Sequence, residues 1–189
     1  MELTIQPLTP ERWPALEDLF GRSGASGGCW CMYWRIGPAY RLRPREENRE
    51  ALRAVVERGS PPGLLAFDGD RVVGWCQLTP RRDLPWLEGR REFVPVDEVP
   101  VWAVSCFFVR RGYRGQGVMT ALIGEALRTA KRAGAPALEA YPVDDSLAGA
   151  TTNRFTGTAA AFRRAGFVEV ARRSPARPVM RHDLAGIER

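Results

Sequence analysis

The sequence contains very little histidine and lysine. Its 189 residues include one histidine, His182, and only one lysine, Lys131, among the 28 lysine and arginine side chains. A hydrolase built on a Ser-His-Asp or Cys-His arrangement would have to use His182 as its base. Because His182 falls in a predicted terminal strand, we expect it to have a surface or packing role. The composition therefore disfavours these hydrolase classes.

Cysteine is also scarce, with four residues at positions 29, 31, 76 and 106. The Cys29-x-Cys31 spacing is shorter than the Cys-x-x-Cys of a zinc knuckle, and no second pair follows. We therefore expect reduced thiols and no bound metal. Cys106 is better interpreted as a buried packing thiol than as a nucleophile that carries an acyl group.

The sequence has no apolar run that approaches the ~20 residues needed to span a bilayer. Residues 1–4 lack the basic and apolar regions of a secretory signal. These features predict a cytoplasmic protein with no membrane partner.

The formal net charge of +6 raises the question of nucleic-acid binding. The arginines are spread along the chain and interrupted by acidic residues, as in residues 45–50. A basic surface attracts phosphate-rich coenzymes as well as polynucleotides, so we expect no nucleic-acid partner. A polynucleotide binder that uses Arg-Gly-Tyr-Arg-Gly at 111–115 and exposed aromatics is the alternative.

The length and the 44% of hydrophobic residues fit a single domain over residues 1–189. Alternating or continuous apolar runs predict strands at 3–8, 63–67, 71–78, 101–109, 137–141, 167–170 and 179–184. Helical spacing predicts helices at 10–20, 45–57, 118–133 and 159–165. Residues 79–100 are expected to form a long connection, and residues 144–153 a flexible loop. The order of these elements predicts an α/β sandwich around a mixed sheet.

The most informative segment is Arg114-Gly115-Gln116-Gly117-Val118-Met119, which separates a buried strand from an amphipathic helix. A glycine-punctuated turn of this kind exposes backbone N–H groups at the positive end of the helix dipole. Such a turn suits a pyrophosphate, because glycine has no Cβ to block the anion. The segment lacks the Gly-Lys-Ser/Thr ending of a triphosphate loop and the glycine order of a dinucleotide fold.

This strand-loop-helix resembles the acyl-coenzyme A loop of the GCN5-related N-acetyltransferase (GNAT) family. Residues 162–167, Phe-Arg-Arg-Ala-Gly-Phe, are similar to the family's short late helix that ends in Gly-Phe. The resemblance extends from Leu3 to about Leu184. It implies an α/β fold with a mixed, mostly antiparallel sheet flanked by helices on both faces. It also implies transfer of an acyl group, usually acetyl from acetyl-CoA, to a primary amine of a small molecule or a protein.

The resemblance assigns the coenzyme-binding residues. Backbone groups of Phe107, Phe108 and Val109 would hold the pantetheine and the acetyl carbonyl. The pyrophosphate would lie against the six residues Arg114, Gly115, Gln116, Gly117, Val118 and Met119. Met119 occupies a position that is commonly glycine or alanine, but the contact there uses a backbone N–H. Arg110 and Arg111 could add charge-assisted bonds to phosphates, or could simply be solvated.

The catalytic groups depart from the family's pattern. The late-helix tyrosine that often protonates the leaving thiolate is replaced by Phe162, and an earlier asparagine is replaced by Phe155. Glu139 and Tyr141 share one face of a predicted strand, which makes them the candidate base and acid. The alternative for Glu139 is a strand-edge carboxylate paired with an arginine. The missing tyrosine also leaves open a catalytically degenerate protein that binds acyl-CoA as a sensor or interaction module.

The acceptor amine is not encoded in a pattern that the sequence reveals. Residues 29–34, Cys-Trp-Cys-Met-Tyr-Trp, are equally consistent with core packing and with the lining of a substrate pocket. A homodimer is possible.

Overall fold

The computed structural model describes residues 2–147 and 154–185. Its single seven-stranded sheet has the order β1-β2-β3-β4-β5-β7-β6. The strands are β1 Leu3–Pro7, β2 Gly63–Asp68, β3 Arg71–Pro80, β4 Trp102–Val109, β5 Ala137–Ala140, β6 Val168–Arg172 and β7 Pro178–Asp183. Only β4 and β5 pair in parallel, and all other neighbours are antiparallel.

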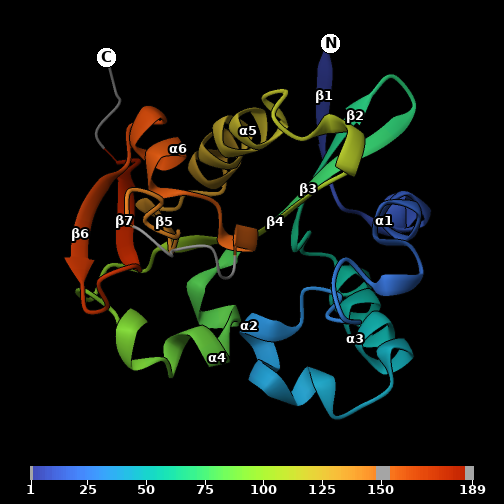
Figure 1. Ribbon diagram of the computed structural model, residues 1–189, viewed down its shortest axis with the longest axis horizontal. Coiled ribbons are helices and arrows are strands. Elements are labelled where there is room, and N and C mark those ends of the chain that lie inside the picture. Colours follow the sequence, from blue (N-terminus) through green and yellow to red (C-terminus); the bar gives the residue numbers. More distant parts are fainter. Residues whose placement is uncertain (1, 148–153, 186–189) are drawn as a thin grey trace.

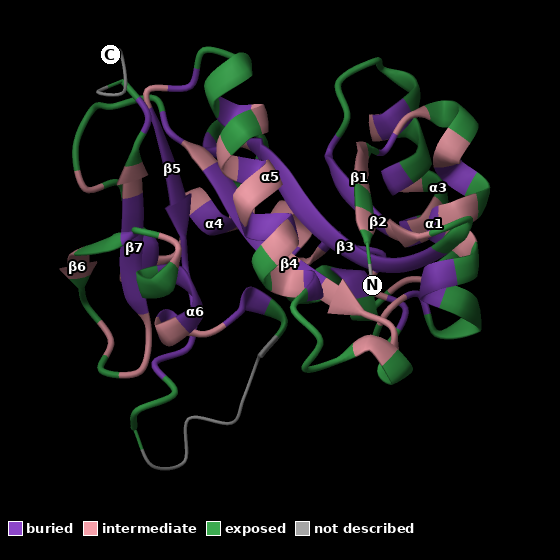
Figure 2. Cartoon of the chain, turned by 90° about the horizontal axis from the view of Figure 1, so that it is seen from above, coloured by how far each residue is buried: buried purple, intermediate pink, exposed green. Residues whose placement is uncertain are grey.

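The helices are α1 Trp13–Phe20, α2 Tyr33–Ile36, α3 Arg45–Glu57, α4 Pro85–Glu88, α5 Val118–Arg132 and α6 Ala159–Arg164. Short 3-10 turns connect several of them. α5 and α6 pack on one face of the sheet, where their apolar side chains join those of β2–β5 and β7. α1 and α3 cover the other face over β2 and β3, and α2 and α4 lie there beside β4 and β5 (Figure 1). The central strands are therefore buried along most of their length (Figure 2).

Two features of β4 position the site. Against β3, the register changes from Gln77↔Cys106 to Leu78↔Val104, which leaves Ser105 as an extra, bulged residue. Against β5, pairing begins at Trp102↔Leu138 and ends at Val104↔Ala140. The half of β4 that follows the bulge is thus paired with β3 but not with β5, so one of its edges is open.

The predicted fold class and the predicted order of the main elements are confirmed. The long connection expected at residues 79–100 is confirmed except at its start, because β3 continues to Pro80; the link to β4 contains α4 and two 3-10 turns. Leu84, Leu87 and Phe93 bury this segment against the sheet. Most of the predicted loop at 144–153 lies outside the described residues. No helix in the described part of the chain has the length and apolar character needed to cross a membrane.

Candidate active site

The glycine loop between β4 and α5 has the backbone geometry expected of an anion site. Gly115 and Gly117 both adopt positive φ angles, 76° and 83°, which favour glycine. A Cβ built on either residue would meet no atom within 4 Å, so both face open space. α5 begins directly after Gly117, and the first N–H groups of a helix have no partner within it. The loop therefore presents several donors to an unobstructed surface.

A pocket of about 700 Å³ lies against this loop. It extends from the loop along the end of β4 to the late helix, and its lining includes Phe107, Phe108, Val109, Arg114, Gly115, Gly117, Val118, Met119, Phe155 and Arg164. We call it the loop pocket. It contains eight of the nine residues that the sequence predicted for coenzyme binding. The exception is Gln116, whose amide donates to the Gly112 carbonyl at 2.7 Å.

Two arginines close to the loop, Arg110 and Arg114, have different environments. Arg110 forms an ion pair with Asp18 at 2.5 Å and donates to the Val72 carbonyl, and it does not line the loop pocket. Arg114 lines the pocket, and its Nε donates to the Val109 carbonyl at 3.2 Å. Arg114 is therefore the better placed of the two to face a phosphate.

A second pocket, of about 340 Å³, opens on the opposite side of β4. We call it the acceptor pocket. Its lining combines residues 25–41 with the end of β4: Ala25, Ser26, Cys29, Cys31, Tyr33, Trp34, Pro38, Tyr40, Arg41, Cys106, Phe107, Phe108, Phe155 and Thr156. Phe107, Phe108 and Phe155 line both pockets, so the two cavities meet at the open edge of β4.

The bulge in β4 is held by hydrogen bonds to side chains of α2 and β3. Trp34 Nε1 donates to the Ser105 carbonyl at 2.9 Å, and the Ser105 hydroxyl donates to Gln77 Oε1 at 2.9 Å. Gln77 in turn donates to the Cys31 carbonyl at 3.1 Å. This buried network connects the residue 25–41 segment to the strand that separates the pockets.

The cluster at residues 29–34 serves both of the roles considered from the sequence. Trp30, Cys31, Met32 and Trp34 are buried, and Cys29, Cys31, Tyr33 and Trp34 also line the acceptor pocket. Cys31 Sγ accepts from Trp75 Nε1 at 3.1 Å and lies 3.8 Å from Cys106 Sγ. Cys106 thus has a packing partner, but it is only partly buried and lines the acceptor pocket, so its interpretation as a buried packing thiol stays a prediction.

The late helix presents no hydroxyl at the position of the missing tyrosine. Phe162 is 0% exposed and packs against Phe107 and Phe167, with ring centroids 6.1 Å and 5.0 Å away. Phe155, in contrast, is 42% exposed at the junction of the two pockets. Phe155 therefore lines the junction, Phe162 lines neither pocket, and neither ring offers a proton donor.

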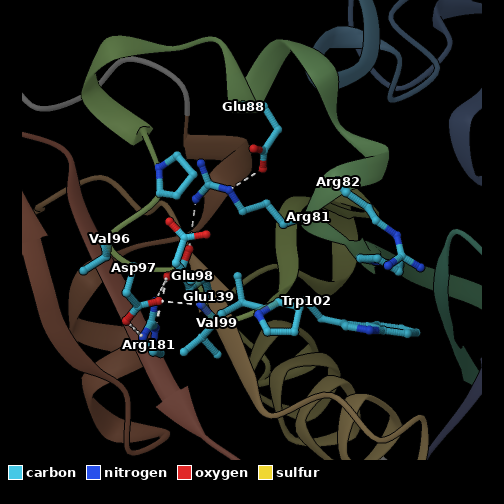
Figure 3. A pocket seen from close by; sticks show the side chains of 14 residues that line it. Arg81, Arg82, Glu88, Val96, Asp97, Glu98, Val99, Trp102, Glu139 and Arg181 are labelled. Carbon is cyan, nitrogen blue, oxygen red and sulfur yellow. Dashed lines mark hydrogen bonds and ion pairs between the residues drawn. The ribbon is translucent and has the colours of Figure 1, made fainter.

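Glu139 of β5 and Tyr141, the residue directly after the strand, lie on the same side, as predicted, but they point into a different part of the molecule. Glu139 lines a separate pocket of about 300 Å³, which includes none of residues 107–109. Its carboxylate accepts from Arg81 at 3.0 Å and from Arg181 at 2.8 Å (Figure 3). It also accepts from the Tyr141 hydroxyl at 2.8 Å. Asp97 and Glu88 complete the cluster by pairing with Arg181 and Arg81.

Burial first, and then the adjacent Glu139 carboxylate, raises the pKa of Tyr141 well above its ordinary value. The phenol therefore stays protonated, and its proton is already donated to Glu139. The base and acid roles of these two residues stay predictions, but the contacts favour the alternative of a carboxylate paired with arginine.

Comparison with known proteins agrees with the geometry. The family model of the acetyltransferase (GNAT) family matches residues 28–152. This chain belongs to the GNAT family. No curated protein matches the sequence.

Among solved structures, this GNAT chain is similar to the PaiA N-acetyltransferase of Thermoplasma acidophilum in complex with coenzyme A. That match has 15% identity and a TM-score of 0.57, and it covers 97% of this chain and 99% of the other. An N-acetyltransferase of Staphylococcus aureus matches with 15% identity, 97% and 99% coverage and a TM-score of 0.56. The yncA structure of Salmonella typhimurium with its cofactor acetyl-CoA has 14% identity, 96% and 94% coverage and a TM-score of 0.54. At these identities the matches establish the shared fold.

Several residues of this GNAT site were not singled out by sequence reasoning. Tyr40 and Arg41 lie in a 3-10 turn that carries no periodic pattern, and Gln77 and Ser105 look like ordinary strand residues. A polar Gln77 in the middle of an apolar run was the one available signal, because a buried amide needs partners.

Proposed function

We propose that this GNAT protein transfers an acyl group, normally acetyl, from coenzyme A to a primary amine. The observation that carries the proposal is that the loop pocket and the acceptor pocket meet at the open edge of β4. One cavity ends on the glycine loop that suits a diphosphate, and the other is a separate entrance for a second substrate. Their junction is where the two substrates would react.

The residues present fit acyl-coenzyme A. Open space beside Gly115 and Gly117 lets a diphosphate reach the backbone N–H groups at the start of α5. The unpaired edge of β4 offers N–H and C=O groups to the amide-containing pantetheine arm, as a neighbouring strand would. Bound acyl-coenzyme A supplies the activated thioester. A β4 N–H in the segment 107–109 would stabilise negative charge that develops on its carbonyl oxygen.

The acceptor must lose a proton, because most amines are protonated near neutrality. In the described part of the chain, no residue that lines the acceptor pocket is an aspartate, a glutamate or a histidine. We therefore propose that the proton leaves through water, and that the enzyme acts mainly by positioning the free amine against the thioester.

The decisive experiment combines calorimetry with acetyl-CoA and a thiol-release assay with a panel of amines. Binding in the micromolar range together with release of free coenzyme in the presence of an amine supports the transferase. Absence of both binding and thermal stabilisation by acetyl-CoA would remove the assigned coenzyme site.

A second candidate is the degenerate acyl-CoA-binding module, and the buried Phe162 is the observation that favours it. Binding of acetyl-CoA with no thiol release from any amine would support this candidate over the transferase. Three further expectations stay predictions. Localisation in cells would test the cytoplasmic location, and light scattering would test the homodimer. Binding measurements at several salt concentrations would test the absence of nucleic-acid binding.

A further inference from the structure

The walls of the acceptor pocket are aromatic and carry no negative charge. Seven of the lining residues are aromatic rings or proline: Tyr33, Trp34, Pro38, Tyr40, Phe107, Phe108 and Phe155. Among residues 2–147 and 154–185, no carboxylate lines the pocket, and Arg41 is its one charged lining residue. A second ammonium group on the acceptor would therefore enter an aromatic cavity with no carboxylate to pair with.

The Arg41 guanidinium is available to a ligand. Its Nε donates to the Tyr40 hydroxyl at 3.0 Å, and its guanidinium carbon lies 5.2 Å from the centre of the Tyr40 ring. In the part of the chain that the structure describes, no carboxylate lies within ion-pairing distance of it. The remaining N–H groups of its fork match the geometry of a carboxylate or a phosphate.

Arg41 also marks the boundary with a third pocket, of about 380 Å³, that is strongly basic. This pocket is lined by Ser23, Gly27, Gly28, Tyr40, Arg41, Arg43 and Arg45. Arg45 has a partner in Glu46 at 3.6 Å, whereas the Nε of Arg43 donates to the neutral Asn48 amide oxygen at 2.6 Å. The positive potential of these side chains therefore reinforces that of Arg41 at the outer end of the acceptor pocket.

On the basis of the proposed transferase function, we propose that the acceptor is a primary amine with an aromatic or apolar body and an anionic group. The amine reaches the open edge of β4, the body lies between the aromatic walls, and the anion pairs with Arg41. Polycationic amines are disfavoured, because Arg41 repels a second ammonium group and the walls offer it only a weak attraction to aromatic faces. The carboxylate of an amino acid and a phosphate group share the required chemistry.

Four probes that differ only in the group opposite the reactive amine test the inference. These are 4-(aminomethyl)benzoate, 4-(aminomethyl)phenylphosphonate, benzylamine and 1,4-bis(aminomethyl)benzene. We measure kcat/KM for each by thiol release from acetyl-CoA, with the wild-type protein and with Arg41→Glu. Arg53→Glu is the matched control, because Arg53 is an exposed arginine of α3 that pairs only with Glu57 and lines none of the three pockets.

The expected order is anionic, then neutral, then cationic, and comparison of the carboxylate with the phosphonate identifies the preferred anion. Loss of a charge-assisted hydrogen bond predicts a decrease of about 10- to 100-fold for the anionic probes in Arg41→Glu, mainly through KM. Arg53→Glu should keep the wild-type order. A wild-type preference for the diamine, or equal effects of Arg41→Glu and Arg53→Glu, would overturn the inference.

Failure of the two proposals can be told apart. If acetyl-CoA binds and none of the four probes is turned over, the acceptor class assigned here is wrong and the coenzyme site stands. If calorimetry detects no acetyl-CoA binding, the transferase itself is refuted.

Discussion

Replacement of Glu139 by glutamine separates a structural role of this carboxylate from a catalytic one. Glu139 is 1% exposed, and the side chains of its partners Arg81 and Arg181 are 6% and 10% exposed. Glutamine keeps one oxygen acceptor but places an NH₂ donor against groups that are themselves donors. Arg81 and Arg181 keep Glu88 and Asp97 as partners, so the variant loses charge-assisted hydrogen bonds but leaves neither arginine unpaired. Because such bonds contribute roughly 1.5–3 kcal/mol, we expect Glu139→Gln to lower the free energy of unfolding by about 2–3 kcal/mol.

Glu125 of α5 provides a matched control, because it also bridges two arginines. Its carboxylate pairs with Arg128 at 2.8 Å and with Arg132 at 2.7 Å, but those arginine side chains are 63% and 64% exposed. Exposed pairs contribute roughly 0–1 kcal/mol each, so Glu125→Gln should change stability by about 1 kcal/mol or less.

Urea unfolding followed by tryptophan fluorescence measures both variants, and thiol release measures turnover per folded molecule. If Glu139 has a structural role, turnover of the folded Glu139→Gln protein should stay close to that of the wild type. A general base contributes roughly 10²- to 10⁴-fold. Unchanged stability together with a turnover loss of that size would refute the structural interpretation and restore Glu139 as the base.

Four further measurements test other parts of the site. Gly117→Asp should weaken acetyl-CoA binding, measured by calorimetry, at least about tenfold through charge repulsion. Gly117→Asn introduces a side chain of similar shape that tolerates positive φ, and it should retain most of the affinity. Equal losses of affinity in the two variants would contradict a diphosphate at this position. Burial first, and then the neighbouring Cys31 thiol, raises the pKa of Cys29 to about 11. Its alkylation by iodoacetamide should therefore accelerate about tenfold per pH unit until pH approaches 11, and a plateau near pH 8 would contradict this. Because no described residue that lines the acceptor pocket is a carboxylate or a histidine, kcat/KM should rise with pH up to the pKa of the amine substrate. An amine of lower pKa should shift the pH profile down by the difference between the two amine pKa values, and a profile independent of the amine would indicate an enzyme base. Trp34→Phe removes the donor to the Ser105 carbonyl and should lower the free energy of unfolding by about 1–3 kcal/mol, and no change in denaturation would show that the bulge needs no such support.

The local features of the fold could be predicted from the sequence because each has a short-range cause. Alternation and apolar runs locate the strands, and the glycines at 115 and 117 locate the turn that must adopt positive φ. The same local logic correctly placed Glu139 and Tyr141 on the same side, although β5 ends at Ala140. It could not determine what lies opposite that face, because Arg81 and Arg181 are 58 and 42 residues away from Glu139.

The acceptor pocket was beyond sequence reasoning for a related reason. Its walls come from an irregular segment at residues 25–41, from β4 and from residues 155–156, and only tertiary packing brings these together. The aromatic run at 29–34 is ambiguous in the sequence because Trp34 does two things in the structure. Its ring is part of the core, and its Nε1 supports the strand that separates the pockets.

The three phenylalanines common to both cavities impose a volume constraint on the two substrates. Phe107, Phe108 and Phe155 bound a single junction, so carbon atoms added to the transferred group occupy space that the incoming nucleophile also needs. Propionyl-CoA should therefore react only with smaller acceptor amines than acetyl-CoA does, and butyryl-CoA only with amines that are smaller still. Replacing Phe155, the most exposed of the three rings, with a smaller residue would enlarge the junction, so that larger acyl groups could react with larger amines.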